Sequence, residues 1–330
     1  MKPFAALFAV LSISAVSCRE TAGTESAPER VSLEFSVAVE GSSRSSVSED
    51  AVGSLDVLVF DKFSGLQEAS ARSSGQESVS VSVRRGVELE YRLVANAAAG
   101  TFAGVKNLED YASLSSPLSS NSPGAFLMAG GGNSVFEASA SVKVSLSRMV
   151  SKVELGSVTA AFSSLLPSGT GVTLQRVFLV NVASGIPFSL AASSSCGWLC
   201  KMGPDSSLAS PLDGFLTSQQ GLSFGGTTPL ECGVTLYCCP NPVDNGVNSQ
   251  TNPSWSVRNT RLVLELLVSD RTCYYPITLP AMKPNTCYKV NQAVLTGFGS
   301  SHPDIPVSGI ALSGGIVVSE WDSETLLCEL

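Results

Sequence analysis

The feature that most constrains this chain is the alternation of apolar and polar residues along many short segments. In segment 31–39, the odd positions carry valine, leucine or phenylalanine, while positions 32, 34 and 36 carry serine or glutamate. Valine alternates with serine over 78–83, and apolar residues alternate again over 87–93. Because successive side chains of a strand point to opposite faces, each of these segments predicts a strand with one buried face.

A break in this alternation divides the chain. Apolar residues occupy even positions over 136–146, whereas Met149, Val153 and Leu155 occupy odd positions after Arg148. A shift of one residue moves every side chain to the other face, and the run exceeds the usual strand of about 5–6 residues. We therefore predict two strands in different sheets and a domain boundary near Arg148. The two predicted domains are an N-terminal β-sandwich over 31–147 and a C-terminal one over 148–330.

The second half continues in the same style. Segments rich in serine, glycine, proline and asparagine separate its predicted strands and are typical of loops, notably 191–228 and 241–259. The glycines at 130–132 are typical of a turn. One short helix is predicted after Asn107, with acidic residues in its first turn. Many short strands with one or two short helices predict an all-β fold built of β-sandwiches. The further predicted strands are 55–60, 172–182, 232–239, 261–268, 273–279, 286–295 and 315–321.

Composition excludes several classes of protein. With 44% hydrophobic and 15% charged residues, the 330-residue chain is too apolar to be disordered and long enough for about two domains. The net charge of -8 and the pI near 4.8 argue against a nucleic acid as partner.

The chain begins with an export signal that ends at a cysteine. Lys2 precedes the apolar run 4–11, and small residues lead up to Cys18. This pattern predicts removal of residues 1–17 and attachment of lipid to Cys18, since a cysteine at the cut is what lipoprotein processing requires. The alternative is an ordinary signal peptide with a chance cysteine. Residues 18–30 are predicted to form a flexible tether, and the apolar run is shorter than the ~20 residues of a membrane span.

The other cysteines all lie from Cys196 onward, nine being present in total. Export permits disulfides, and Cys273 and Cys287 flank a predicted hairpin, so we predict that these two are bonded. The sequence does not determine the pairing of the others. The adjacent pair 238–239 and the Cys-x3-Cys at 196–200 lack zinc spacing, so neither a metal nor another cofactor is predicted.

Several segments, taken in chain order, resemble those of one family. They are the lipobox at Cys18, Val31 to Arg44, Leu55 to Asp61, Tyr91 to Asn96, Val144 to Glu154, Leu236 to Asn241, Tyr275 to Ile277, Asn285 to Val290, Leu295 to Ser300 and Val318 to Trp321. The ordered set resembles the fimbrillins, the lipoprotein pilins of type V pili. The resemblance implies two transthyretin-like β-sandwich domains, a surface location in a fimbrium at the outer membrane, and assembly with other pilin subunits by strand donation.

In the stalk pilins of this family, a protease specific for arginine cuts after the first strand, and a strand of a neighbouring subunit fills the groove that is left. The position that matches here is Arg44, in the polar segment 41–46. Small flexible residues suit a protease-sensitive loop. The alternative is a solvated arginine in an uncut loop. The cysteine-rich second half departs from a plain stalk subunit, which favours an accessory or anchor role.

No enzyme is predicted. The single histidine, His302, lies in a predicted turn, and no serine or acid is marked as its catalytic partner. The main alternative function is a cell-surface carbohydrate-binding lipoprotein, because surface sandwiches hold sugars on aromatic side chains. Trp198 and Trp255 fall in predicted loops where they could meet a ligand of the host or bacterial surface, whereas Trp321 falls in a strand pattern and is predicted to be core.

Overall fold

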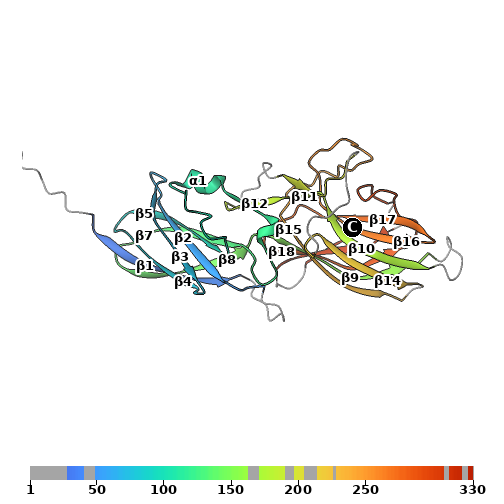
Figure 1. Cartoon of the computed structure of the whole chain (residues 1–330), viewed down its shortest axis with the longest axis horizontal. Helices are drawn as coiled ribbons and strands as arrows, with labels where there is room; N and C mark the ends of the chain where they lie inside the picture. The colour runs from blue at the N-terminus through green and yellow to red at the C-terminus, as the bar shows by residue number, and fades with distance from the viewer. Residues whose placement is uncertain are drawn as a thin grey trace, which may run out of the picture.

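The strands form two bodies that follow one another along the long axis of the molecule (Figure 1). We call them the N-terminal and the C-terminal sandwich. The predicted all-β fold class is confirmed. The computed structural model describes residues 28–40, 49–162, 171–189, 197–203, 214–225, 228–307, 312–321 and 326–329.

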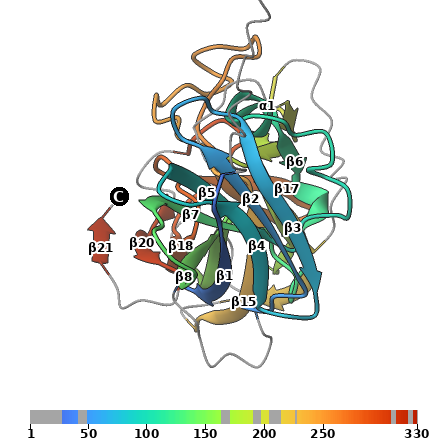
Figure 2. The ribbon, with the colours of Figure 1, turned by 90° about the vertical axis from the view of Figure 1, so that its left-hand side faces the viewer.

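The N-terminal sandwich is one sheet that folds over on itself. Strand order in the sheet is β3-β2-β5-β7-β8-β1-β4. Strands β7 and β8 pair only where Met128 faces Arg148 and Ala129 faces Ser147, so the sheet separates there into two layers. The layers enclose a core of side chains from β1, β2, β4, β5 and β8, and Figure 2 views this sandwich from its free end. The strands are β1 (Arg30–Val39), β2 (Ser54–Asp61), β3 (Gln67–Ser74), β4 (Ser78–Arg84), β5 (Glu88–Ala95), β7 (Met128–Val135) and β8 (Ala140–Arg148).

A short helical connection joins the two sandwiches along one side. Helix α1 (Leu108–Ser113) begins where predicted, with the Asn107 side chain accepting a hydrogen bond of 2.8 Å from the backbone N–H of Asp110. Strand β6 (Ser115–Pro117) and the 3-10 helix η1 (Leu118–Ser120) follow. Strand β6 pairs with β12 (Gly185–Pro187) of the second half, so main-chain bonds cross the junction.

The C-terminal sandwich has two facing sheets. One has the order β14-β10-β16-β17, and the other has β15-β9-β18-β20-β21 with β19 also on β18; β11 and β13 form a small separate pair. In each sandwich the first strand lies between an antiparallel neighbour and a parallel one: β1 between β4 and β8, and β9 between β15 and β18. The strands are β9 (Ser151–Ala160), β10 (Val172–Val180), β11 (Val182–Ala183), β13 (Trp198–Leu199), β14 (Thr217–Phe224), β15 (Leu230–Cys238), β16 (Arg261–Val268), β17 (Arg271–Thr278), β18 (Thr286–Leu295), β19 (Leu312–Ser313), β20 (Gly315–Glu320) and β21 (Leu326–Glu329).

The turn predicted at glycines 130–132 is wrong. They lie inside strand β7 rather than in a turn. A Cβ on Gly130 would lie 2.3 Å from the backbone oxygen of Ser145, and one on Gly131 would lie 2.4 Å from that of Tyr91. Glycine is needed here because a second backbone approaches closely, and such an approach is one of the usual reasons for a glycine inside a strand.

The hairpin predicted between Cys273 and Cys287 is also wrong. Strand β17, which carries Cys273, pairs with β16, and β18, which carries Cys287, pairs with β9 and β20 of the other sheet. Cys273 packs in the core as a free thiol. The alternation of β18 puts Tyr288 and Val290 toward that core and Cys287 on the opposite face. The predicted disulfide is accordingly absent. Segment 191–228 is corrected too, since it contains β13 and β14.

Candidate functional site: the groove of the first strand

Strand β1 is an inner strand of the N-terminal sandwich and lies between β8 and β4 (Figure 2). It is antiparallel to β4, with register from Arg30–Arg84 to Ser36–Ser78, and parallel to β8, with register from Leu33–Ala140 to Val39–Leu146. Backbone hydrogen bonds therefore hold it on both edges. We call the space that β1 occupies between β4 and β8 the β1 groove.

The structure confirms the predicted alternation of buried apolar and outward-facing polar residues along β1. Val31, Leu33, Phe35 and Val37 are 8%, 0%, 0% and 9% exposed, while Ser32, Glu34 and Ser36 point outward. The ring of Phe35 lies 5.1 Å from that of Tyr91. At ~1.5–3 kcal/mol for each large apolar side chain, their burial contributes roughly 6–12 kcal/mol as an upper bound. Loss of β1 would therefore open a strongly apolar groove.

Two neighbouring strands would form the walls of that groove. Val79, Val81 and Val83 of β4, together with Val144 and Leu146 of β8, are buried against β1. Without β1, the facing backbone N–H and C=O groups of both strands would lose their partners. Unpaired strand edges beside an apolar floor form a template for an added strand.

Arg148, the residue at the break in alternation, fixes the end of β1. Its buried guanidinium donates to the carbonyl oxygens of Glu40 at 3.1 Å and Glu49 at 3.3 Å, and it pairs with the carboxylate of Asp50. It also donates to Asn285 Oδ1 of the C-terminal sandwich at 3.1 Å. One side chain thus holds the residues on either side of segment 41–48 and joins them to the second body.

Glu49 makes a second connection between the bodies. Its carboxylate accepts hydrogen bonds from the Tyr237 hydroxyl at 2.6 Å and the Lys152 ammonium at 3.1 Å, besides one from Trp321. Burial alone would raise the pKa of this carboxyl, but the hydrogen bonds from Tyr237 and Trp321 and the charge of Lys152 bring it below its usual value. We call Glu49, Arg148, Lys152, Tyr237 and Trp321 the junction cluster.

The comparisons with known proteins agree with this geometry. Residues 30–165 match the model of the family described as major fimbrial subunit protein (FimA). Over these residues, the chain is similar to the fimbrillin family. The resemblance inferred from the sequence is confirmed. No curated protein matches the chain.

Solved structures share the fold of this chain over most of its length. A putative cell adhesion protein from Bacteroides eggerthii is 16% identical with a TM-score of 0.65, covering 91% of this chain and 98% of its own. A fimbrilin from Porphyromonas gingivalis is 15% identical with a TM-score of 0.63, covering 88% and 97%. A putative cell adhesion protein from Parabacteroides distasonis is 16% identical with a TM-score of 0.62, covering 89% and 100%. At such identities the likeness concerns the fold.

Two of the predicted site residues lie outside the described residues of the chain. These are Cys18 and Arg44. Sequence reasoning missed the junction cluster, although Arg148 gave a signal: it is a charged residue at the position where an apolar alternation changes phase. None of the helices in the described ranges is long and apolar enough to cross a membrane.

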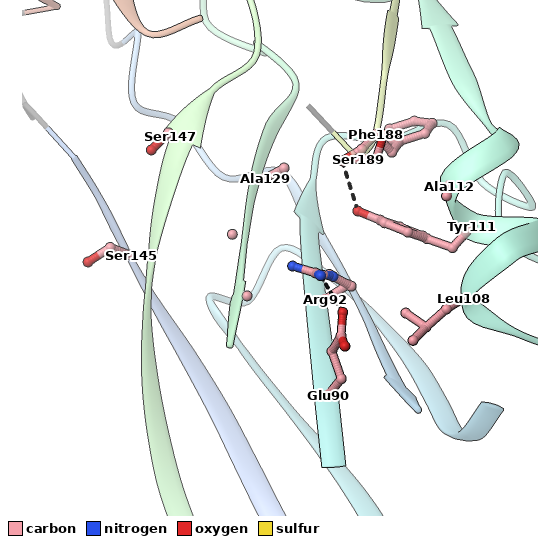
Figure 3. Close-up of a pocket in the computed structure, with 12 residues that line it drawn as sticks. Glu90, Arg92, Leu108, Tyr111, Ala112, Ala129, Ser145, Ser147, Phe188 and Ser189 are labelled. Carbon is pink, nitrogen blue, oxygen red and sulfur yellow. Dashed lines mark hydrogen bonds and ion pairs between the residues drawn. The ribbon is translucent and has the colours of Figure 1, made fainter. Parts of the chain in front are cut away.

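A cavity of about 470 Å³ lies where β7 and β8 separate, and Figure 3 shows its lining. Tyr111 of α1 donates a hydrogen bond of 3.1 Å to the carbonyl of Phe188, and Arg92 pairs with Glu90 below it. Burial raises the pKa of Tyr111 to about 12. Because its ring is buried and its hydroxyl bonded, Tyr111 serves to pack α1 on the segment after β12.

The single histidine of the chain, His302, takes part in a hydrogen-bonded turn. His302 Nδ1 accepts a hydrogen bond of 3.1 Å from the backbone N–H of Asp304, inside the predicted turn. The buried Asp304 carboxylate pairs with Arg258 at 2.8 Å and Arg261 at 2.6 Å. Burial lowers the pKa of His302. These groups form a cluster of hydrogen bonds and ion pairs that supports the loop over 241–259.

Proposed function

We propose that this protein is a lipid-anchored subunit of a fimbrium that assembles by strand donation. The observation that carries the proposal is the position of β1. This apolar strand is the first of the described strands and pairs with both β4 and β8. Its removal would leave a groove that only another strand satisfies in both its backbone bonds and its apolar contacts. Main-chain bonds would give such a complex its affinity, and alternate side chains would give it its register.

The lipid anchor belongs to the same proposal. Cys18 stands at a signal-peptide cut, and residues 18–30 lead from it to β1. Acyl chains on this cysteine would hold the protein at the outer membrane, since several chains anchor stably where one binds only marginally. An uncut chain would then connect the membrane directly to its own first strand.

We favour an accessory or anchor role over that of a stalk subunit. Eight of the nine cysteines lie in the second half, which is unlike a plain repeated unit. In an anchor, β1 remains in its own groove and the lipid remains attached, so the subunit would join the fibre by donating a strand to the groove of the next subunit and not by accepting one. In a stalk subunit, cleavage at Arg44 would remove both, and the mature chain would begin at Ser45.

Intact-mass spectrometry of the protein extracted with detergent from the cell surface, together with its fimbriae, tests this proposal. An acylated chain that begins at Cys18 and migrates in an SDS-resistant ladder is the result we expect. Arg44→Ala should leave the ladder unchanged, as should the matched control Arg85→Ala, which replaces another arginine of the same sandwich. A mature chain beginning at Ser45 would overturn the anchor role and support a stalk role. An unacylated chain found solely as a monomer would overturn the whole proposal.

A further inference from the structure

The fold brings two tryptophans together on the C-terminal sandwich. Trp198 lies in β13, and Trp255 lies 57 positions later in the loop over 241–259. Their ring centroids are 5.6 Å apart and their planes are inclined by 60°. Both residues are half-buried and neither belongs to the closed core. By contrast, Trp321 is fully buried, as its strand pattern predicted.

The loop that carries Trp255 is built rigidly around a buried arginine. The guanidinium of Arg258 donates to the carbonyl oxygens of Ser254 at 2.8 Å, Ser256 at 3.0 Å and Asn252 at 3.3 Å. Its carbon lies 5.2 Å from the centre of the Trp255 ring. The loop backbone on both sides of Trp255 is therefore tied to one side chain, which holds the indole in place. Preorganised aromatic groups bind a ligand with little further loss of conformational freedom.

The charge beneath and beside this pair is positive. Arg258 and Arg261 share the single carboxylate of Asp304. Lys201 is exposed, with its ammonium 5.6 Å from the centre of the Trp255 ring. Asp244 also lies in this loop, where its carboxylate accepts a hydrogen bond from Asn259. Among these described residues, three cations against two carboxylates leave one net positive charge, on a chain whose net charge is -8.

We propose that Trp198, Trp255 and Lys201 form a binding site for an acidic sugar residue of a surface glycan. The C–H faces of a sugar ring pack on the indole surface, and the carboxylate of a sialic or uronic acid pairs with the Lys201 ammonium. The inference goes beyond the proposed function, because it adds a ligand to the fimbrial subunit. It does not depend on strand donation, because the site lies in the C-terminal sandwich and the β1 groove lies in the other.

Titration of the purified full-length protein with defined oligosaccharides tests the site. The probes are sialyllactose and tri-galacturonic acid, which distinguish the two sources of the carboxylate, and neutral lactose. We expect one acidic probe to bind and lactose to bind far more weakly, with affinity falling as salt rises from about 0.05 to about 0.5 M. Isothermal calorimetry or tryptophan fluorescence reports the binding.

Variants then assign the binding to these residues. Trp255→Ala should lower affinity about tenfold or more, and Lys201→Gln should lower it about three- to fivefold for the acidic probe while leaving lactose unchanged. Lys143→Gln, an exposed lysine of the other sandwich, is the matched control. Should Trp255→Ala fold poorly by circular dichroism, Trp198→Phe and Trp255→Phe keep the packing and reduce the ring surface.

Three outcomes would overturn the proposal. They are the absence of binding to both acidic probes at about 5 mM, beyond the millimolar end of specific affinity, equal binding of lactose, and full binding by the tryptophan variants. Because the assay uses monomeric protein, failure of fimbrial assembly leaves its result unchanged. A positive result with an unassembled protein would likewise say nothing for strand donation.

Discussion

The indole N–H of Trp321 donates a hydrogen bond of 2.8 Å to the carboxylate of Glu49, across 272 positions of sequence. Trp321 directly follows β20, and Glu49 lies between β1 and β2. The Tyr237 ring stacks on the indole at 5.8 Å, and the Arg148 guanidinium lies 5.0 Å from its centre. The end of the first strand and the end of a late strand are thus fastened at one buried point.

Glu49 should make stability depend on acid. Its pKa is lowered in the folded state, so its ionised form stabilises the fold above the unfolded value near 4.5, and this contribution is lost as pH falls through the lower folded value. Glu49→Gln should cost about 2–3 kcal/mol at pH 7, because buried donors lose a charged acceptor. Urea unfolding from pH 7 to pH 3 should show a smaller loss for the variant, and Glu109→Gln, in α1, is the control. Parallel curves for wild type and Glu49→Gln would contradict this.

Phe35 should carry much of the stability that β1 supplies. Phe35→Ala removes a fully buried ring and should lower the unfolding free energy by about 3–5 kcal/mol. The neighbouring Ser36 faces outward on the same strand, so Ser36→Ala should change it by less than about 0.5 kcal/mol. Equal effects in chemical denaturation would mean that β1 contributes little to the core.

Gly130 should not tolerate a side chain. Alanine there would place its Cβ 2.3 Å from the Ser145 oxygen, at the point where the two layers of the sheet join. We expect Gly130→Ala to lower the unfolding free energy by about 2 kcal/mol or more. Gly104→Ala is the control, since nothing lies within 4 Å of its added Cβ. A thermal shift equal to that of the control would show that β7 and β8 can move apart freely.

Buried thiols should resist alkylation in the folded protein. Burial raises the pKa of Cys238 to about 12 and also raises that of Cys273, so neither forms much thiolate at pH 8. Iodoacetamide should label Cys273 fully once the chain is unfolded without reductant. A peptide that links Cys273 to Cys287 under these conditions would refute the corrected assignment.

The alternation of apolar and polar residues predicted the strands whose inward-facing residues are all apolar, such as β1 and β4. It missed β3, whose sequence of serine, alanine, glutamine and arginine carries no such pattern, and β14, which is equally polar. These strands lie at sheet edges, where pairing with one neighbour decides the structure. The helix after Asn107 was predictable because its cap is local.

Only the part of the candidate site that a single strand forms could be predicted from the sequence. The apolar face of β1 is legible in nine consecutive residues, but the partners of Glu49 come from Lys152, Tyr237 and Trp321. Contacts between such distant positions depend on how the two sandwiches meet. The same holds for Trp198 and Trp255, which the sequence placed in separate loops and the fold brought into contact.

The parallel and antiparallel ladders of β1 have a mechanical consequence for an anchored fimbrium. Tension between a lipid on Cys18 and the rest of the fibre would enter at Arg30 and pull along the axis of β1. Backbone bonds to β4 and β8 run across that direction, so the load would be shared by both ladders at once instead of opening one pair after another. The fold would then resist shear at the very strand by which it holds the cell.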